Sequence, residues 1–300
     1  MAVVADNDAR EELALLRASV RDALAAGAQL DDLGLWSTLT PPDGSLALGM
    51  VVAEELGRGL CAGPAYDVMV GNLVAAELGI DADAAFVTGD APGIIDPTVA
   101  VPPETLLLIA TGDTLAGALV AAAQVDETPS MDVTRRTVRY SVGATDPVAG
   151  QPDTVARTRT ARGLLYAADT LGCIEHVLDK TVEYARQRTT FGAPIGKYQA
   201  VAHRLVDHTI TARQLRLLLD DAAATFDARG EALALRLATA ETFLWGRGTE
   251  IISDCIQLCG GIGFTWEWGH HLYLRRTVQN CTLGMGYGRP RRRLAEEAGW

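Results

Sequence analysis

The chain has 300 residues, of which 48% are hydrophobic, and a formal net charge of −12. That length suffices for one large domain or two ordinary ones. The negative charge argues against nucleic acid or an anionic membrane as the main partner. We find no apolar run of the roughly 18 residues that a membrane span needs and no secretory signal at the start, so a cytoplasmic location is expected.

The first 80 residues are predicted to be helical. From Glu11 onward, apolar residues repeat at three- and four-residue spacing. A second helix follows a cap at Asp43 or Ser45, and a third covers residues 65–78 and stops before a glycine. This pattern indicates an N-terminal helical domain over 1–80.

Residues 81–155 have a different character, since glycine, proline, threonine and valine become more frequent. Short apolar runs at 105–109 and 118–120 and an alternating run at 137–142 are typical of strands. This β region is too short for a large barrel.

The remaining residues, 156–300, return to helical periodicity. We predict long helices over 155–188, 199–229 and 231–258, which are expected to pack as an antiparallel bundle. The fold class is therefore mainly α with a small β region. The predicted domains are 1–80, 81–155 and 156–300.

Residue clusters that could bind a metal have simpler explanations. Cys255 and Cys259 lie one helical turn apart, but a metal pair would need two more ligands, so buried thiols in a reducing compartment are favoured. His203 and Asp207 stand at i and i+4 beside His208, and a surface hydrogen bond is favoured over a metal or acid–base pair. No metal site is predicted.

Two polar features near the C-terminus could face a ligand. His270-His271 follow a Trp-Glu-Trp-Gly sequence without a carboxylate or cysteine cluster around them. Arg289 and Arg291–Arg293 form a basic patch. The patch is expected to be solvated, and the alternatives are contact with acidic groups of a partner subunit or with the 3′-phosphate of coenzyme A.

The motif Arg188-Thr-Thr-Phe-Gly192 ends a long predicted helix. A cation is favoured there by the helix dipole, which explains the arginine without any ligand. Alternatively, its guanidinium pairs bidentately with a pyrophosphate. Gln257 and the Gly260-Gly-Ile-Gly263 turn end another helix, where glycines permit close backbone approach to a ligand and also ordinary helix termination.

Taken together, the stretches 183–207 and 256–267 resemble the C-terminal half of the acyl-CoA dehydrogenase family. The resemblance is dense over 155–285 and faint over 45–80. It implies N-terminal helices, a β-domain and a four-helix-type bundle, in a tetramer with FAD at a subunit interface. Under this resemblance, the residues that match FAD-contacting positions across that interface are Arg188, Thr190, Phe191, Gln257, Gly260 and Gly261.

The resemblance also implies a reaction. A glutamate removes the α-proton of an acyl thioester while a hydride passes from Cβ to flavin N5, and an electron-transfer flavoprotein or similar acceptor reoxidises the cofactor. The sequence departs from this pattern because the expected glutamate position falls on Gly284. The position that some relatives use instead falls on Arg162, and an arginine stays protonated. Leu283, Met285 and Gly286 cannot act as a base either, so no catalytic residue is expected.

A second departure concerns residues 81–155, which contain neither the family's Thr-Glu-Pro turn nor its Trp-x-Thr/Ser strand, so the β-domain is truncated. We therefore expect a small non-catalytic subunit in an α2β2 heterotetramer with a full-length paralogue that binds the acyl-CoA. It resembles actinobacterial assemblies that shorten steroid and cholesterol side chains. The alternatives are a homo-oligomeric flavoenzyme with a relocated base, such as Glu175 or Glu183, and a flavin-free interaction subunit.

Overall fold

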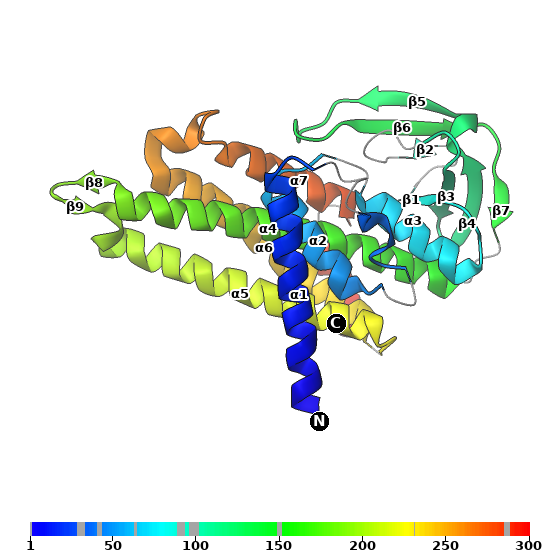
Figure 1. Cartoon of the computed structure of the whole chain (residues 1–300), viewed down its shortest axis with the longest axis horizontal. Helices are drawn as coiled ribbons and strands as arrows, with labels where there is room; N and C mark the ends of the chain where they lie inside the picture. Colours follow the sequence, from blue (N-terminus) through cyan, green and yellow to red (C-terminus); the bar gives the residue numbers. More distant parts are fainter. Residues whose placement is uncertain are drawn as a thin grey trace.

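The structure is a computed structural model that describes residues 2–28, 34–40, 44–62, 65–88, 94–95, 102–148, 152–230, 232–284 and 289–300. Helices occupy both ends of the chain, and two small sheets lie between them (Figure 1). The helical elements are α1 (Ala2–Ala25), η2 (Leu35–Ser37), α2 (Leu46–Arg58), α3 (Ala65–Leu78), α4 (Pro152–Gln187), η4 (Ile195–Lys197), α5 (Gln199–Asp227), α6 (Leu233–Cys259), η5 (Gly260–Phe264), α7 (His270–Gly284) and α8 (Arg289–Glu297).

Helix α4 is the central element of the molecule. It packs against α2, α5, α6 and α7, and its residues 160–174 are all buried. A helix buried on every side is normally apolar all round. Helix α4 instead carries two charged residues, Arg162 and Asp169, inside the buried stretch. Buried charges of this kind need partners of opposite charge.

Two glycines let α2 and α4 cross at very close range. A Cβ on Gly172 would overlap the carbonyl oxygen of Glu54, and a Cβ on Gly57 would overlap the carbonyl oxygen of Asp169. Each helix therefore places its glycine against the backbone of the other. Any larger residue at either position would push the helices apart.

Ion pairs fasten α1 to the rest of the protein. Glu54 and Glu55 of α2 are buried, and Arg21 of α1 pairs with Glu55 at 2.8 Å. Arg17 of α1 and Arg216 of α5 both pair with Glu54. Burial raises the pKa of Glu54, and the two arginines oppose that shift. The buried carboxylates are thus matched by cations from two other helices.

Strands β1 to β7 form two separate sheets. One has the order β1-β3-β4-β7 and the other the order β2-β6-β5. The strands are β1 (Ala84–Thr88), β2 (Ile94–Ile95), β3 (Leu106–Thr111), β4 (Thr114–Leu119), β5 (Ala123–Thr128), β6 (Thr137–Val142) and β7 (Asp146–Val148), with η3 (Val120–Ala122) before β5. A two-residue pair, β8 (Thr189–Thr190) and β9 (Ala193–Pro194), extends from the end of α4.

Pairing within the first sheet is mixed. Strand β1 runs parallel to β3, with Phe86 opposite Leu108, whereas β3, β4 and β7 are antiparallel neighbours. Helix α3 lies over β1, and Gly71 allows its backbone to approach Ala84 closely. The β region therefore joins the helices through α3 rather than standing apart.

The predicted fold class is confirmed: the protein is mainly α with a small β region. Ser45 caps α2, since its hydroxyl accepts a hydrogen bond from the Leu48 N–H at 3.2 Å, while Asp43 lies outside the described residues. The predicted helix over 231–258 starts later, at Leu233, because Ala232 has a positive φ of 61°. Among the described residues, no helix combines the length and hydropathy that a membrane span requires. The three domain boundaries stay a prediction.

Candidate functional site

The Arg188–Gly192 motif forms a tight hairpin beyond the end of α4. Thr190 pairs with Ala193 across it, and the two residues between them, Phe191 and Gly192, both have positive φ values of 48° and 79°. Positive φ at both central positions is the requirement of a type I′ turn. Glycine meets it freely, but phenylalanine is strained there.

The strained residue is also fully solvent-exposed. The Phe191 side chain is 100% exposed, so no packing contact of this side chain with the described residues compensates for its strained backbone. The hairpin itself is held from below, since the Tyr198 hydroxyl donates to the Thr190 carbonyl at 2.8 Å and the Ile195 N–H donates to the Arg188 carbonyl at 2.8 Å. The protein thus builds a defined turn that presents an aromatic ring outward.

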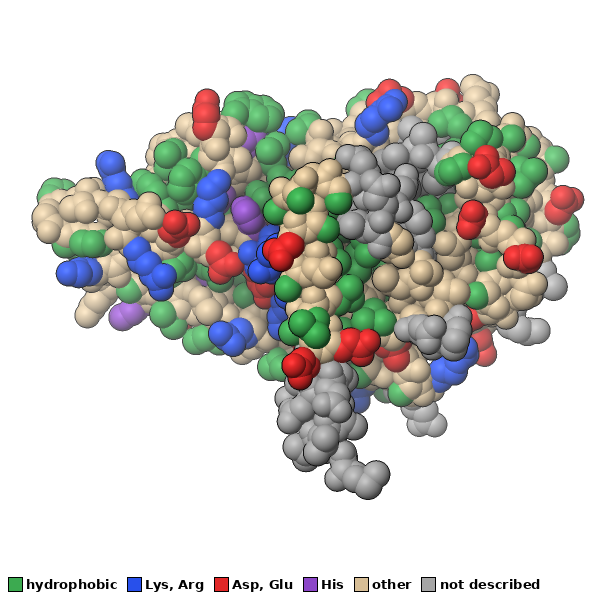
Figure 2. Space-filling view, in the orientation of Figure 1, with side chains coloured by type: hydrophobic (Ala, Val, Ile, Leu, Met, Phe, Trp, Pro, Cys, Tyr) green, Lys and Arg blue, Asp and Glu red, His purple; other side chains and the backbone are tan. Residues whose placement is uncertain are grey.

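Arg188, at the base of the hairpin, is exposed as well. Within the described ranges it has no carboxylate at ion-pair distance, although most other arginines of the bundle have one. Several basic side chains lie at this end of the bundle, at the left of Figure 2. The guanidinium is therefore available for an anion.

Gln257 and the glycine turn lie at the same end of the bundle, where α6 passes into η5 (Figure 1). Gln257 is exposed, Gly260 has a φ of 64°, and a Cβ on Gly260 or Gly261 would meet nothing within 4 Å. The following segment returns to α4, where Lys180 donates to the Trp268 carbonyl at 2.8 Å. Arg188, Gln257 and the backbone at Gly260 and Gly261 are groups of the kind that bind the phosphate oxygens and polar edges of a dinucleotide.

The two positions at which a catalytic glutamate was sought meet inside the protein. Arg162 of α4 donates to the carbonyl of Leu283, directly before Gly284 at the end of α7. Its Nε also donates to Asp67 of α3 at 2.7 Å, and Arg162 is buried. A Cβ on Gly284 would lie 3.6 Å from Tyr166. An arginine–aspartate pair thus occupies the place where the resemblance expects a base.

A larger polar network lies next to this pair. Asp169 of α4 is fully buried and accepts hydrogen bonds from Arg276 at 2.7 Å, from Arg135 at 2.6 Å and from Asn280 at 2.6 Å. The Tyr66 hydroxyl donates to it as well. Arg135 comes from the loop between β5 and β6, so the network joins the β region to α3, α4 and α7.

Two arginines contact Asp169 in this network, and one of them, Arg135, also lies 3.7 Å from the buried Asp132. Burial alone would raise the pKa of Asp169, but Arg135 and Arg276 outweigh that effect and hold the pKa well below its usual range. A buried carboxylate held ionised between two arginines is a poor proton acceptor. Asp169 is therefore not suited to act as a base.

Neither of the two relocated bases considered from the sequence is free. Glu175 pairs with Arg216 at 2.8 Å and with Arg58 at 3.4 Å. Glu183 is exposed and accepts a hydrogen bond from Gln187 at 3.0 Å. Their contacts are those of surface residues on a helical bundle.

Among the described residues, no hydrogen bond joins His203 to Asp207. His208 instead contacts Asp254 of α6 at 2.7 Å, because α5 directs that residue toward its neighbouring helix, and Arg204 pairs with the same carboxylate. Cys255 and Cys259 are buried free thiols, as predicted. In the part of the chain that the structure describes, no cluster of His, Cys, Asp or Glu could hold a metal ion.

His270 is buried, with its Nε2 3.2 Å from the Thr181 hydroxyl. Burial lowers the pKa of His270 to about 3, and Lys180 acts in the same direction. The imidazole is therefore neutral and structural.

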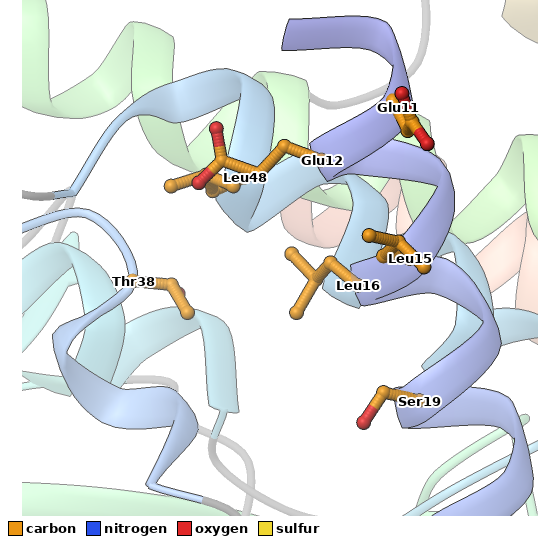
Figure 3. A pocket seen from close by; sticks show the side chains of 7 residues that line it. All are labelled: Glu11, Glu12, Leu15, Leu16, Ser19, Thr38 and Leu48. Atoms are coloured by element: carbon orange, nitrogen blue, oxygen red, sulfur yellow. The ribbon is translucent and has the colours of Figure 1, made fainter. Parts of the chain in front are cut away.

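A groove of about 670 Å³ lies beside α1, and no basic side chain among its lining residues could bind a phosphate (Figure 3). Its lining residues are Glu11, Glu12, Leu15, Leu16, Ser19, Thr38 and Leu48.

Sequence reasoning missed the Asp169 network and also Glu241 of α6. Glu241 is fully buried, and its carboxylate oxygens have no hydrogen-bond partner among the described residues. Burial raises the pKa of Glu241 to about 8, and Arg293 opposes the shift. One signal was available: Glu241 falls in the buried period that includes Leu237, Leu244 and Gly248.

The chain is similar in sequence to one family of known proteins. Residues 154–284 match the family described as "Acyl-CoA dehydrogenase, C-terminal domain". "Acyl-CoA dehydrogenase IpdE2" of Mycobacterium tuberculosis is 32% identical over 288 residues, which cover 89% of this chain and 86% of that protein. The protein of the same name from Mycolicibacterium smegmatis is 31% identical, over 84% of this chain and 78% of its own length.

Solved structures agree in fold. A variant of the "Tcur3481-Tcur3483 steroid ACAD" has a TM-score of 0.78 at 22% identity, covering 96% of this chain and 98% of that one. The "ChsE4-ChsE5 complex" from Mycobacterium tuberculosis has a TM-score of 0.71 at 22% identity, covering 93% and 87%. The chain belongs to the acyl-CoA dehydrogenase family.

Proposed function

We propose that this chain is a subunit of a hetero-oligomeric, FAD-dependent acyl-CoA dehydrogenase. It lacks a catalytic glutamate of its own and completes the FAD site of a full-length partner. The observation that carries this proposal is the contrast within one chain. Arg188, Phe191 and Gln257, which match FAD-contacting positions, are exposed, and Arg188 has no ion pair among the described residues. The positions of the base are instead occupied by Gly284 and by Arg162, which pairs with Asp67.

In this proposal the exposed end of the bundle binds only one part of the cofactor. Arg188 pairs with the pyrophosphate, the Thr190 hydroxyl hydrogen-bonds beside it, and Phe191 covers an apolar face. Gln257 and the open backbone at Gly260 and Gly261 accommodate the ADP portion. When bound, FAD supplies the hydride acceptor for oxidation of the acyl thioester. The partner supplies the base and the surface that holds the thioester.

The arrangement of the assembly and its substrate belong to the same proposal. Two of the solved structures with this fold are named for two proteins each, and one is called a steroid ACAD. This supports a heterotetramer with two copies of each subunit, acting on the coenzyme A thioester of a steroid side chain. An electron-transfer flavoprotein or similar acceptor would reoxidise the flavin.

Co-expression with a full-length family member tests the proposal. We expect two FAD per tetramer when the two chains are purified together and none when this chain is purified alone. Arg188→Ala should weaken FAD retention by the complex by about tenfold or more, since it removes a charge-assisted contact. Arg186→Ala, which removes an exposed arginine two residues away, serves as the matched control and should retain FAD.

The flavin content and activity of the chain alone, compared with those of the complex, separate the alternatives. Gly284→Glu should give no dehydrogenase activity in the chain alone, because the new carboxylate would lie beside Arg162. Flavin and activity in the unmodified chain alone would contradict the proposal and favour a homo-oligomeric enzyme. A stable complex of the two chains that contains no flavin would favour a purely structural subunit.

A further inference from the structure

A groove between α6 and α8 has no role in the proposed function. Its volume is about 440 Å³, which lies in the range of small-molecule sites. Its polar groups come from arginines and threonines, and no carboxylate lines it. The lining residues are Thr239, Thr242, Phe243, Gly246, Arg247, Arg291 and Leu294.

In helix α8 the basic residues lie at the N-terminal end and the acidic residues at the C-terminal end, which is unfavourable with respect to the helix dipole. The nine-residue helix begins with Arg-Pro-Arg-Arg-Arg and ends with Glu296 and Glu297. Cations are unfavourable at the positive N-terminal end of a helix and anions at its C-terminal end. The exposed pair of Arg292 with Glu296 at 2.7 Å has the less favourable order as well. An anion held by the arginines would relieve this arrangement.

The groups that face the groove are available to such an anion. Arg291 is exposed and has no ion pair among the described residues, and its Nη2 lies 4.0 Å from the Cβ position of Gly246, which leaves space over α6. The Thr242 hydroxyl is shielded from solvent and has no hydrogen-bond partner within the described ranges. Arg247 pairs with Glu250 in a half-exposed contact at 2.9 Å, which contributes little stability and is its one ion pair within the described part of the chain.

We infer that this groove binds a small molecule that carries a phosphate or pyrophosphate group. The two guanidinium groups and the Thr242 hydroxyl would hold the anion, and the N-terminal dipole of α8 would add to the attraction. Phe243 and Leu294 provide an apolar wall for the organic part of the ligand. Gln257 lies 11 residues beyond Gly246 along α6, which is about 16 Å at the helical rise. The groove is therefore separate from the proposed FAD contact.

Calorimetric titration of the full chain with pyrophosphate and with ADP tests the inference. Arg291→Gln should weaken the binding of both probes by about tenfold or more, and Thr242→Val should weaken it by a smaller factor. Arg275→Gln, at an exposed arginine of α7, should bind like the wild type. Binding should fall as salt is added. Equal melting temperatures of the variants would show that folding is unchanged.

Measurements in an Arg188→Ala background separate this groove from the FAD contact, because binding to the groove should persist there. The inference is overturned if the wild-type chain binds neither probe, or if Arg275→Gln loses as much affinity as Arg291→Gln. It is also overturned if an oligoglutamate peptide binds through Arg291 while pyrophosphate does not, since the groove would then be a contact for an acidic protein segment.

Discussion

The charged residues at the outer end of the bundle differ from those in its interior around Gly284 in their burial and in their ionic partners. At the outer end, Arg188 is exposed and has no ionic partner among the described residues, and Phe191 has a positive φ and a fully exposed side chain. In the interior, Asp169 and Arg162 are buried, and each is matched by groups of opposite charge. The difference indicates that the outer end is adapted to a group from outside the chain, and the interior to the chain's own stability.

The largest expected effect concerns the interior. Asp169→Asn would leave the buried Arg276 without its carboxylate and Arg135 with the more distant Asp132, at 3.7 Å, and we expect it to lower the free energy of unfolding by about 3–5 kcal/mol. Denaturant unfolding of the isolated chain measures this. Asp179→Asn removes a carboxylate that is 70% exposed, and it should change stability by less than about 1 kcal/mol.

If Asp169→Asn and Asp179→Asn unfold alike, the interior network does not stabilise the fold. Should Asp169→Asn fail to fold at all, Asn280→Ala gives a milder test. It removes one neutral donor to Asp169 and should cost about 1–3 kcal/mol.

A smaller effect of the opposite sign is expected at Glu241. The pKa of this buried group is about 8 in the folded protein, against roughly 4.3 when unfolded. The folded state therefore binds more protons between these two values, and the stability of the wild type falls as pH rises through that window. Glu241→Gln removes this loss, so the variant should be more stable by roughly 1–3 kcal/mol at pH 7.

Thermal unfolding from pH 4 to pH 9 measures the difference, which should vanish at the acidic end. Glu250→Gln, at a half-exposed position on the same helix, should follow the wild type at every pH. A wild type whose stability does not change relative to Glu241→Gln between pH 5 and pH 8 would show that Glu241 is ionised and paired in solution.

The smallest effect is expected at the outer end. Phe191→Gly should stabilise the isolated chain by up to about 1 kcal/mol, because glycine adopts the positive φ without strain. The same change should reduce FAD retention by the complex of the two subunits. Phe264→Gly replaces an exposed phenylalanine that has no positive φ, so it should bring no gain in stability. A loss of stability at both positions would contradict a strained turn.

Features with a local cause could be predicted from the sequence. Ser45 caps α2, the helix over 65–78 has the predicted bounds, and the alternating run at 137–142 forms β6. Each depends on residues within a few positions of one another. The exposed hairpin at Arg188 was likewise foreseen as a turn between long helices.

The interior could not be predicted in this way. Arg135 and Arg276 lie 34 and 107 residues from Asp169, and no local pattern relates them. The parallel pairing of β1 with β3 has the same origin, since it depends on where α3 places the first strand. Counting along the sequence located Gly284 and Arg162 separately, but only the fold brings them together.

The meeting of these two positions bears on how the chain could evolve. A glutamate gained at 284 would lie next to Arg162 and would be held ionised by it, so it would gain little basicity. Loss of Arg162 first would leave Asp67 buried without its cation, at a cost of several kcal/mol. Neither single substitution leads back toward proton abstraction. The contact between Arg162 and the Leu283 carbonyl therefore opposes the return of a base at either position by a single substitution.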